Sequence, residues 1–210
     1  MPALVVADPI ADLVLRRPEL AACQVSLNAV ADLLCERFAA GRTVLICGNG
    51  GSAADAEHWS GELLKGFERR PPPAGAHGLP NRLGARLQAG LPVIPLSGFP
   101  SLRTAVANDC HPSLEFAQLV VAFGKPGDVL IGISTSGRAR NVRYAAKVAR
   151  ARGLATIALT GGRGEPLAGH CDLAIKVPAA TTAAAQELHL PVYHALCRVV
   201  ELRLFPGHPP

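Results

Sequence analysis

Five short apolar runs alternate with longer segments of helical periodicity, and this alternation most constrains the fold. The runs are residues 43–47, 92–96, 128–133, 155–159 and 173–177. Short runs of this kind, bounded by turn residues, are typical of parallel strands that are buried on both faces. Strands that alternate with helices predict an α/β fold, in which a doubly wound, five-stranded parallel sheet forms the middle of three αβα layers.

The segments between these runs predict helices. We expect them at 20–40, ending before Gly41, at 52–67 with Ser52 as the cap, at 102–107 and 112–122, at 139–152 and at 181–204. The first is an addition at the N-terminus, and Pro191 should either kink the last or mark a tight start. Residues 69–90 form a Pro/Gly-rich insertion loop. The length of 210 residues predicts one domain over 1–210, with its core at about 20–204.

Composition narrows the class of protein. The net charge of +5 is scattered along the chain and suits a small anionic substrate as well as nucleic acid, but aromatic residues make up only 4 %, which disfavours a base-stacking surface. The six cysteines form no close pair, so we expect reduced thiols in a cytoplasmic protein. A charged, proline-interrupted N-terminus predicts no signal peptide, and no apolar run reaches the ~18 residues that a membrane span needs.

Two strand–turn–helix junctions carry residues suited to a phosphate group. They read G-N-G-G-S at 48–52 and S-T-S-G at 134–137. Ligands of open parallel sheets lie beyond the carboxyl ends of the strands, where helix N-termini offer free N–H groups to an anion. A glycine-rich turn is also ordinary in this position, and neither junction is a dinucleotide or nucleotide fingerprint. Three consecutive hydroxyls make the second junction the more informative one.

Three polar side chains, His58, Glu62 and His194, could supply the ligands of a metal ion. His58 and Glu62 are four residues apart and therefore lie on one helix face. An isolated pair of this kind is more often a solvated one. Gln186 and His194 are eight residues apart, about 80° around a helix, and crowd a segment that otherwise looks buried. Imidazole and carboxylate groups make a set that zinc accepts, whereas His189 fits a supporting or core position better than a ligand.

Two further features admit both a structural and a functional interpretation. Asn108-Asp109 lies between two predicted helices and on sequence alone fits a cap and turn. Arg138 follows the second junction and could face a phosphate, whereas the other arginines near it are more simply read as solvated surface.

Together these segments resemble the sugar isomerase (SIS) domain family, and within it the phosphoheptose isomerases. The matching runs, which occur in order from about 20 to 204, are G-N-G-G-S-A-A-D-A-E-H-W-S-G-E-L, A-N-D, G-D-V-L-I-G-I-S-T-S-G and Q-E-L-H-L-P-V-Y-H-A-L-C. The resemblance implies a flavodoxin-like αβα subunit, a homotetramer with active sites at subunit contacts, and a small phosphosugar substrate. It implies neither nucleic acid nor membrane as a partner.

The resemblance also implies roles for particular residues. Glu62 and His194 would be the base and acid of an aldose–ketose isomerisation. Zn²⁺ would be held by His58, Glu62, Gln186 and His194. The positions implied or suggested for substrate binding are Asn49, Gly50, Gly51, Ser52, Asn108, Asp109, Ser134, Thr135, Ser136, Arg138 and Gln186.

These roles fit the chemistry of moving a proton between C1 and C2 through an enediolate, which needs one group for the carbon-bound proton and another for protons on oxygen. The expected reaction converts sedoheptulose 7-phosphate to a D-glycero-heptopyranose 7-phosphate. Two alternatives remain open: the same mechanism on another phosphosugar, or a non-catalytic SIS tetramer that binds a protein partner. The chain departs from the family pattern at Arg138-Ala139, Lys65-Gly66 and Ala183, which bears most on the substrate.

Overall fold

The computed structural model describes residues 8–73 and 78–207, and its centre is one parallel sheet. The strands are β1 (Val44–Cys47), β2 (Val93–Pro95), β3 (Val129–Ile133), β4 (Ala155–Thr160) and β5 (Leu173–Lys176), in the order β2-β1-β3-β4-β5. All four strand pairings are parallel. The predicted α/β class, the five strands and the flavodoxin-like order are therefore confirmed, because this is the strand order of flavodoxin-type sheets.

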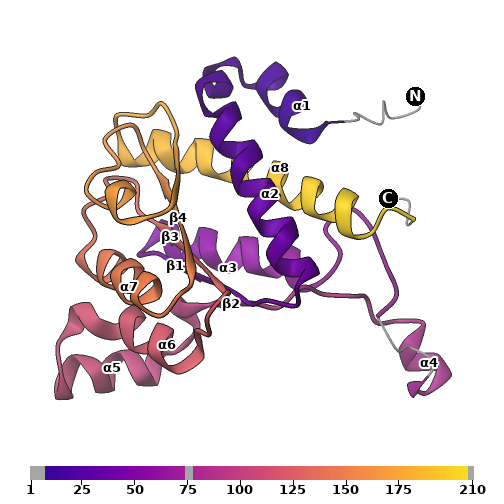
Figure 1. Cartoon of the computed structure of the whole chain (residues 1–210), viewed down its shortest axis with the longest axis horizontal. Coiled ribbons are helices and arrows are strands. Elements are labelled where there is room, and N and C mark those ends of the chain that lie inside the picture. Colours follow the sequence, from indigo (N-terminus) through magenta and orange to yellow (C-terminus); the bar gives the residue numbers. More distant parts are fainter. Residues whose placement is uncertain (1–7, 74–77, 208–210) are drawn as a thin grey trace.

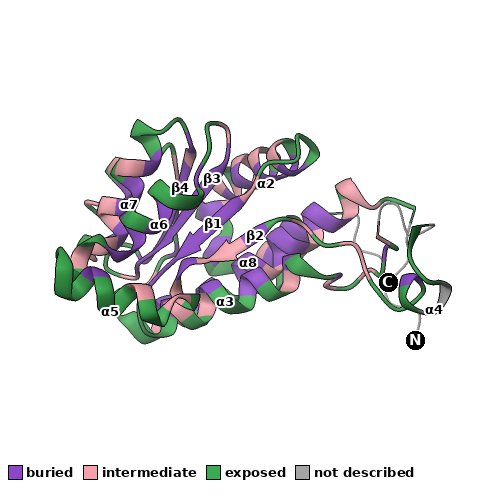
Figure 2. Ribbon diagram, turned by 90° about the horizontal axis from the view of Figure 1, so that it is seen from below, coloured by how far each residue is buried: buried purple, intermediate pink, exposed green. Residues whose placement is uncertain are grey.

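Side chains alternate between two cores, one on each face of the sheet. In β3, Val129 and Ile131 join the core with α2 (Gln24–Ala39), α3 (Gly51–Leu64) and α8 (Thr182–Leu204), whereas Leu130 joins the core with α6 (Glu115–Phe123) and α7 (Arg140–Ala151). This alternation follows from the two-residue period of a strand. Figure 2 shows the resulting layers, with buried strands between helices that are exposed on their outer sides.

The N-terminal region differs from the single helix expected at 20–40. A first helix, α1 (Pro9–Arg16), is capped by Asp8, whose carboxylate accepts the N–H of Ile10 at 2.9 Å. A 3₁₀ turn, η1 (Pro18–Cys23), then leads into α2. Proline has no N–H and favours the first turn of a helix, so two prolines start two separate elements here. Figure 1 shows α1 and α2 lying against the long α8.

Three predicted boundaries need correction. Gly50 rather than Ser52 is the N-cap of α3, because Ser52 is already within the first turn and is buried. The same helix ends at Leu64, not at Phe67. Asn108-Asp109 does not separate two helices but closes α5 (Pro100–Asp109), and the break falls at Cys110-His111, before the 3₁₀ turn η4 (Pro112–Leu114) and α6.

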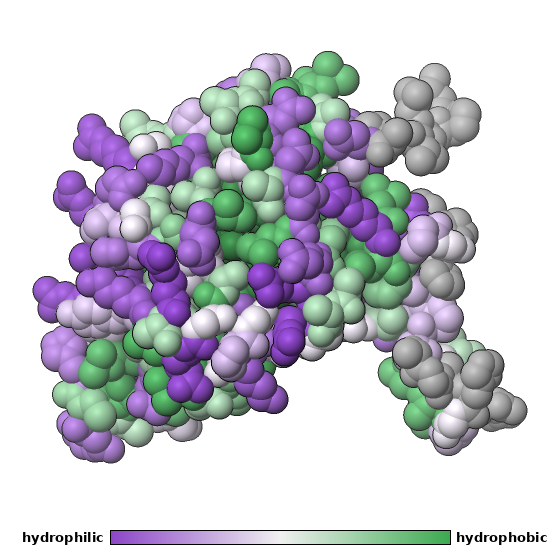
Figure 3. Space-filling view, in the orientation of Figure 1, coloured by the Kyte–Doolittle hydropathy of each residue, from purple (hydrophilic) through white to green (hydrophobic). Residues whose placement is uncertain are grey.

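The insertion at 69–90 contains one short helix, α4 (Asn81–Gly84), and its residues 74–77 lie outside the described residues. Figure 3 shows this segment standing out from the body of the molecule. Its Leu79, Leu83 and Leu87 are exposed. Two further 3₁₀ turns are η3 (Leu96–Gly98) and η5 (Ala168–His170). In the described part of the chain, no helix has the length and apolar character that crossing a membrane would require.

Candidate active site

The two polar junctions predicted from the sequence meet at the switch point of the sheet. β1 and β3 are neighbours, and the helices that follow them pack on opposite faces. The chain therefore diverges after Cys47 and after Ile133, leaving a crevice at the carboxyl edge. Flavodoxin-like sheets bind their ligands at this place. Asn49 and Ser134, from the first and second junction, both lie at this edge.

The first junction brings α3 into contact with α8. Gly50 has φ +55°, a conformation that residues with a side chain rarely adopt. Gly51 lies directly beneath Gln186, since a Cβ at position 51 would be 2.2 Å from the Gln186 side-chain nitrogen. The absence of a side chain at 51 thus lets Gln186 lie across the start of α3. Both Gly51 and Gln186 were predicted substrate positions.

The second junction forms one side of a small pocket of about 160 Å³. Its lining contains the predicted Thr135, Ser136 and Arg138, and in addition Arg163 and the α8 N-terminus at Thr181-Thr182. Ser134 is buried beneath this surface. Hydroxyls, guanidinium groups and the free N–H groups of a helix start are the donors that bind phosphate oxygens. The pocket can therefore hold a phosphate-sized anion.

The predicted metal-type residues His58, Glu62 and His194 also come together. One potential ligand atom from each lies within 4.8 Å of the others. His58 Nε2 is 3.1 Å from a Glu62 carboxylate oxygen, and the His58 and His194 rings meet edge to face with centroids 5.2 Å apart. The His194 Nε2 atom is buried without a hydrogen-bond partner among the described residues. A buried, unsatisfied nitrogen beside a carboxylate is a feature that a bound ion would explain.

Aromatic and acidic side chains on α3 and α8 surround this cluster. The Tyr193 hydroxyl is 3.0 Å from His58 Nδ1, and the Tyr193 ring stacks on Trp59 with centroids 5.6 Å apart. Burial is the main cause that raises the pKa of Tyr193, and the nearby Asp55 raises it further, so the hydroxyl keeps its proton. Burial also raises the pKa of Asp55. A ring nitrogen fixed by a hydrogen bond leaves the other one oriented for its own partner.

The segment that follows α3 borders His194 on its other side. The Phe67 ring lies 5.0 Å from the His194 ring, centroid to centroid. The buried Glu201 carboxylate accepts the backbone N–H groups of Phe67, Glu68 and Arg69, the last two at 3.0 and 3.3 Å. Burial lowers the pKa of His194, and the neighbouring His58 lowers it further, which favours the neutral imidazole that a metal ligand must be.

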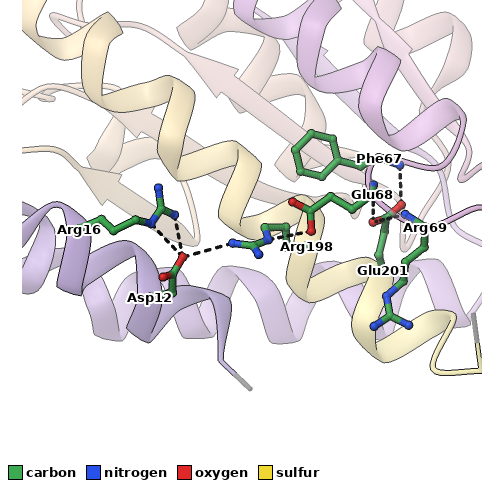
Figure 4. Close-up of polar contacts among 7 residues, drawn as sticks. All are labelled: Asp12, Arg16, Phe67, Glu68, Arg69, Arg198 and Glu201. Atoms are coloured by element: carbon green, nitrogen blue, oxygen red, sulfur yellow. Dashed lines mark hydrogen bonds and ion pairs between the residues drawn. The ribbon is translucent and has the colours of Figure 1, made fainter. Parts of the chain in front are cut away.

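An ion-pair chain extends this arrangement to α1 (Figure 4). Arg198 donates to Glu68 at 2.9 Å and to Asp12 at 3.2 Å, and Asp12 also pairs with Arg16 at 2.8 Å. These residues, together with Phe67, Pro191, His194 and Ala195, line a cavity of about 420 Å³. The cavity lies beside His194, so a small molecule can reach this ring from the side of α1.

Other predicted residues lie outside both groups. Asn108 and Asp109 are exposed at the end of α5 and bond to each other at 2.7 Å. Asn49 and Gly50 line a separate cavity of about 880 Å³ between α3, α5 and α7. His189 is fully buried, which lowers its pKa to about 4, and it does not belong to the three-residue cluster.

Gln186 is displaced from that cluster along the helix. At 1.5 Å per residue, Gln186 and His194 are about 12 Å apart along α8. The structure therefore brings three of the four predicted metal ligands together within one chain and leaves Gln186 at the first junction. Its role as a fourth ligand stays a prediction.

Sequence reasoning missed Arg163, Tyr193 and Glu201. Arg163 had a local signal, because it follows β4 and the carboxyl end of every parallel strand reaches the same edge. Tyr193 adjoins His194 but was read only as part of a matching motif. Nothing in the sequence marks Glu201 as a partner of the 67–69 backbone, since 132 to 134 residues separate the groups.

The chain is similar to known proteins over most of its length. A family model described as SIS domain matches residues 19–161. The phosphoheptose isomerase of Roseiflexus sp. is 41% identical over 177 residues, which cover 84% of this chain and 81% of the relative. Among solved structures, the phosphoheptose isomerase from Neisseria gonorrhoeae has a TM-score of 0.72 and 33% identity, covering 91% of this chain and 94% of its own.

A second solved structure, a phosphoheptose isomerase from Francisella tularensis, gives a TM-score of 0.76 at 31% identity and covers 88% of this chain and 90% of its own. Identities above 30% over most of both chains show a relationship by family and not only a shared fold. The chain belongs to the SIS-domain family and, within it, to the phosphoheptose isomerases, which are sugar-phosphate isomerases.

Proposed function

We propose that the protein is a zinc-dependent ketose–aldose isomerase that converts sedoheptulose 7-phosphate to a D-glycero-heptopyranose 7-phosphate. The observation that carries the proposal is the convergence of His58, Glu62 and His194 within 4.8 Å. Relatives that share about 40% of its sequence are named phosphoheptose isomerases. The choice of heptose rests on that similarity, and the chemistry rests on the residues of this chain.

Glu62 and His194 would divide the proton transfers. The Glu62 side chain is 20% exposed, so its carboxylate can meet substrate while being shielded from bulk water. It would remove the proton from C1 or C2. Burial lowers the pKa of His194 and so favours the neutral imidazole, which would exchange a proton with the carbonyl or hydroxyl oxygen. General acid–base catalysis of this type contributes about 10²- to 10⁴-fold in rate.

The donor set fits Zn²⁺, for which two imidazole nitrogens and one carboxylate oxygen are usual ligands. His58, Glu62 and His194 would hold the ion. When bound, it would polarise the substrate carbonyl and stabilise negative charge on the oxygen. The nitrogens of this set would be the Nε2 of His194, which has no hydrogen-bond partner in the described part of the chain, and the Nε2 of His58, which faces Glu62.

The phosphate group would be anchored in the 160 Å³ pocket by Thr135, Ser136, Arg138 and Arg163. Remote binding of this kind positions the reacting carbons. Thr182, at that pocket, and His194 are twelve residues apart, about 18 Å along α8. That distance exceeds the span of an extended heptose phosphate. We therefore propose that the phosphate pocket of one subunit serves the cluster of another, in a homotetramer with sites at subunit contacts, where Gln186 of a second subunit could complete the metal ligands.

The six free cysteines agree with the proposed cytoplasmic location, where thiols stay reduced. The competing function is a non-catalytic SIS tetramer that binds a protein partner. Such a protein would have no need of a His–Glu–His cluster, so the cluster favours catalysis. An isomerase for another phosphosugar shares every feature of the cluster and differs only in its substrate.

Time-resolved NMR of sedoheptulose 7-phosphate with the purified protein, with and without a chelator, tests the proposal. We expect conversion to the aldose that stops on chelation and returns with Zn²⁺. A panel of pentose, hexose and heptose ketose phosphates serves as the specificity control. Turnover of another sugar without turnover of sedoheptulose 7-phosphate would refute the substrate, and no turnover of any sugar by zinc-loaded protein would refute the enzyme.

A further inference from the structure

Asn49 is held by a chain of polar side chains that the proposed reaction does not use. Asn49 and Asn141 exchange two amide hydrogen bonds, with N···O distances of 2.9 and 2.8 Å. Asn141 also donates to the Glu115 carboxylate at 2.8 Å, and Glu115 pairs with Arg103 at 2.8 Å. The chain thus joins the turn after β1 to the starts of α7 and α6 and to α5.

Glu115 is the one buried side chain among these four, with 8% of its surface exposed. A buried carboxylate is costly unless it is paired and hydrogen-bonded, and here both oxygens are used, one by Asn141 and one by Arg103. A full set of partners of this kind fixes the side chain in one position. Glu115 therefore offers Asn141 a fixed acceptor.

The chemistry of this acceptor determines how both amides are oriented. A carboxylate can only accept, so Asn141 must turn its NH₂ group toward Glu115. Its carbonyl oxygen then accepts from the backbone N–H of Val142 at 3.0 Å and from Asn49. All four hydrogen-bonding positions of the Asn141 amide are filled. Asn49 must in turn present its NH₂ to the Asn141 oxygen, so its amide orientation is fixed as well.

We propose that Asn141, supported by Glu115 and Arg103, is a positioning residue that sets the orientation of the Asn49 amide toward the substrate. Beyond the two bonds to Asn141, the Asn49 amide has one N–H and one oxygen lone pair without a partner among the described residues, and Asn49 lines the 880 Å³ cavity between α3, α5 and α7. These two groups suit a sugar hydroxyl, which both donates and accepts. The identity of the sugar in this inference rests on the proposed function, whereas the geometry rests on the hydrogen bonds of Asn49, Asn141 and Glu115 alone.

A double-mutant cycle tests the coupling. We expect Asn49→Ala and Asn141→Ala each to lower kcat/KM about tenfold, mostly through KM, on the ketose phosphate that the wild type turns over best. If Asn141 acts through Asn49, the double variant will be no worse than Asn49→Ala, because neighbours that act as one unit are not additive. Losses that multiply to about a hundredfold would overturn the proposal.

Glu115→Gln tests the polarity argument, since it keeps the size of the side chain but can present either end of its amide to Asn141. We expect kcat/KM to fall about three- to tenfold, with Glu115→Asp partly restoring it and circular dichroism unchanged. Lys147→Ala, on the exposed side of α7, is the matched control and should be neutral. A Glu115→Gln variant with wild-type KM would contradict the inference.

A crystal structure of Asn141→Ala gives a readout that does not depend on turnover. The Asn49 side chain should leave its present rotamer or occupy two conformers. An Asn49 side chain that stays in place would overturn the positioning role, whatever the substrate. Conversely, a displaced Asn49 in a protein that does not isomerise sedoheptulose 7-phosphate would refute the proposed function and leave the positioning role standing.

Discussion

The start and the middle of α8 are built differently, and the difference matches the roles proposed for them. Near its middle, His194 belongs to a half-enclosed cluster whose members are fixed by side-chain contacts with Tyr193 and Phe67. At its start, Thr181-Thr182 borders an open pocket formed by loops and by the exposed Arg138 and Arg163. Proton transfer needs fixed geometry and partial exclusion of water. Capture of an anion needs accessible charge and donors, and tolerates more movement.

The largest effect is expected at the cluster. Glu62→Gln removes the proposed base while keeping the shape of the side chain, so kcat should fall about a thousandfold. NMR of sedoheptulose 7-phosphate measures it. Glu187→Gln, on an exposed position of α8, is the control and should be neutral. A Glu62→Gln variant with more than a tenth of wild-type kcat would show that the cluster does not carry the proton transfer.

Metal removal should lower kcat more than a hundredfold, because the carbonyl would lose its polarising ion. Dialysis against a chelator, followed by addition of Zn²⁺, checks both loss and recovery. His58→Ala should also reduce the zinc bound per chain in elemental analysis, whereas His170→Ala should not. Full zinc content in His58→Ala would show that the ion binds elsewhere and that the cluster is not a metal site.

His189 lies between these two regions on the buried side of α8, and its burial predicts how the stability of the fold depends on pH. Its folded pKa of about 4 lies below the usual value of about 6.5, so the unfolded chain binds the extra proton. The contribution to stability is therefore complete above pH 6.5 and is lost as the pH falls toward 4. Between pH 7.5 and 5.0 the loss should be about 2 kcal/mol in the metal-free protein.

Urea unfolding of the metal-free protein at the two pH values, at one protein concentration, measures this loss. His189→Leu should retain stability on acidification better than the wild type by that amount, although its stability at pH 7.5 can differ through packing. An unchanged pH dependence in His189→Leu would mean that His189 is not the group that titrates.

The smallest effect is expected at the open pocket. Arg163→Ala should raise KM for the sugar phosphate about tenfold and change kcat less than twofold, because an anchor used equally in ground and transition states affects binding alone. Arg163→Lys should recover part of the loss, and Arg86→Ala is a surface control. A tenfold fall in kcat with no change in KM would show that the pocket takes part in the chemical step. The start of α8 would then not differ in function from the cluster at His194.

The sequence predicts the sheet well because its strands are buried on both faces and read as unbroken apolar runs, as in 129–133. The predicted helix boundaries differ from the observed ones where two sequence signals compete. Ser52 is a good capping residue, but Gly50 adopts the positive φ that starts α3. Asn108-Asp109 fits a turn as well as a helix end, and local composition does not decide between them.

The candidate site was predictable where spacing is local and was missed where contacts are distant in sequence. His58 and Glu62 share a face through helical periodicity alone. Their meeting with His194 was implied by family resemblance, and the Asn49–Asn141–Glu115 chain had no sequence signal, since it joins three elements through tertiary packing. The approach of Arg138 to Arg163 likewise depends on how two loops fold back over the sheet edge.

The contact between Gly51 and Gln186 has a consequence for variation at this position. An alanine methyl group would meet only the mobile end of the Gln186 side chain, so Gly51→Ala should cost the fold little and yet turn Gln186 away from the crevice. Such a change would escape any screen based on expression or melting temperature and would be detected only by selection for activity. Position 51 is therefore one where tolerance of the fold and tolerance of function should diverge.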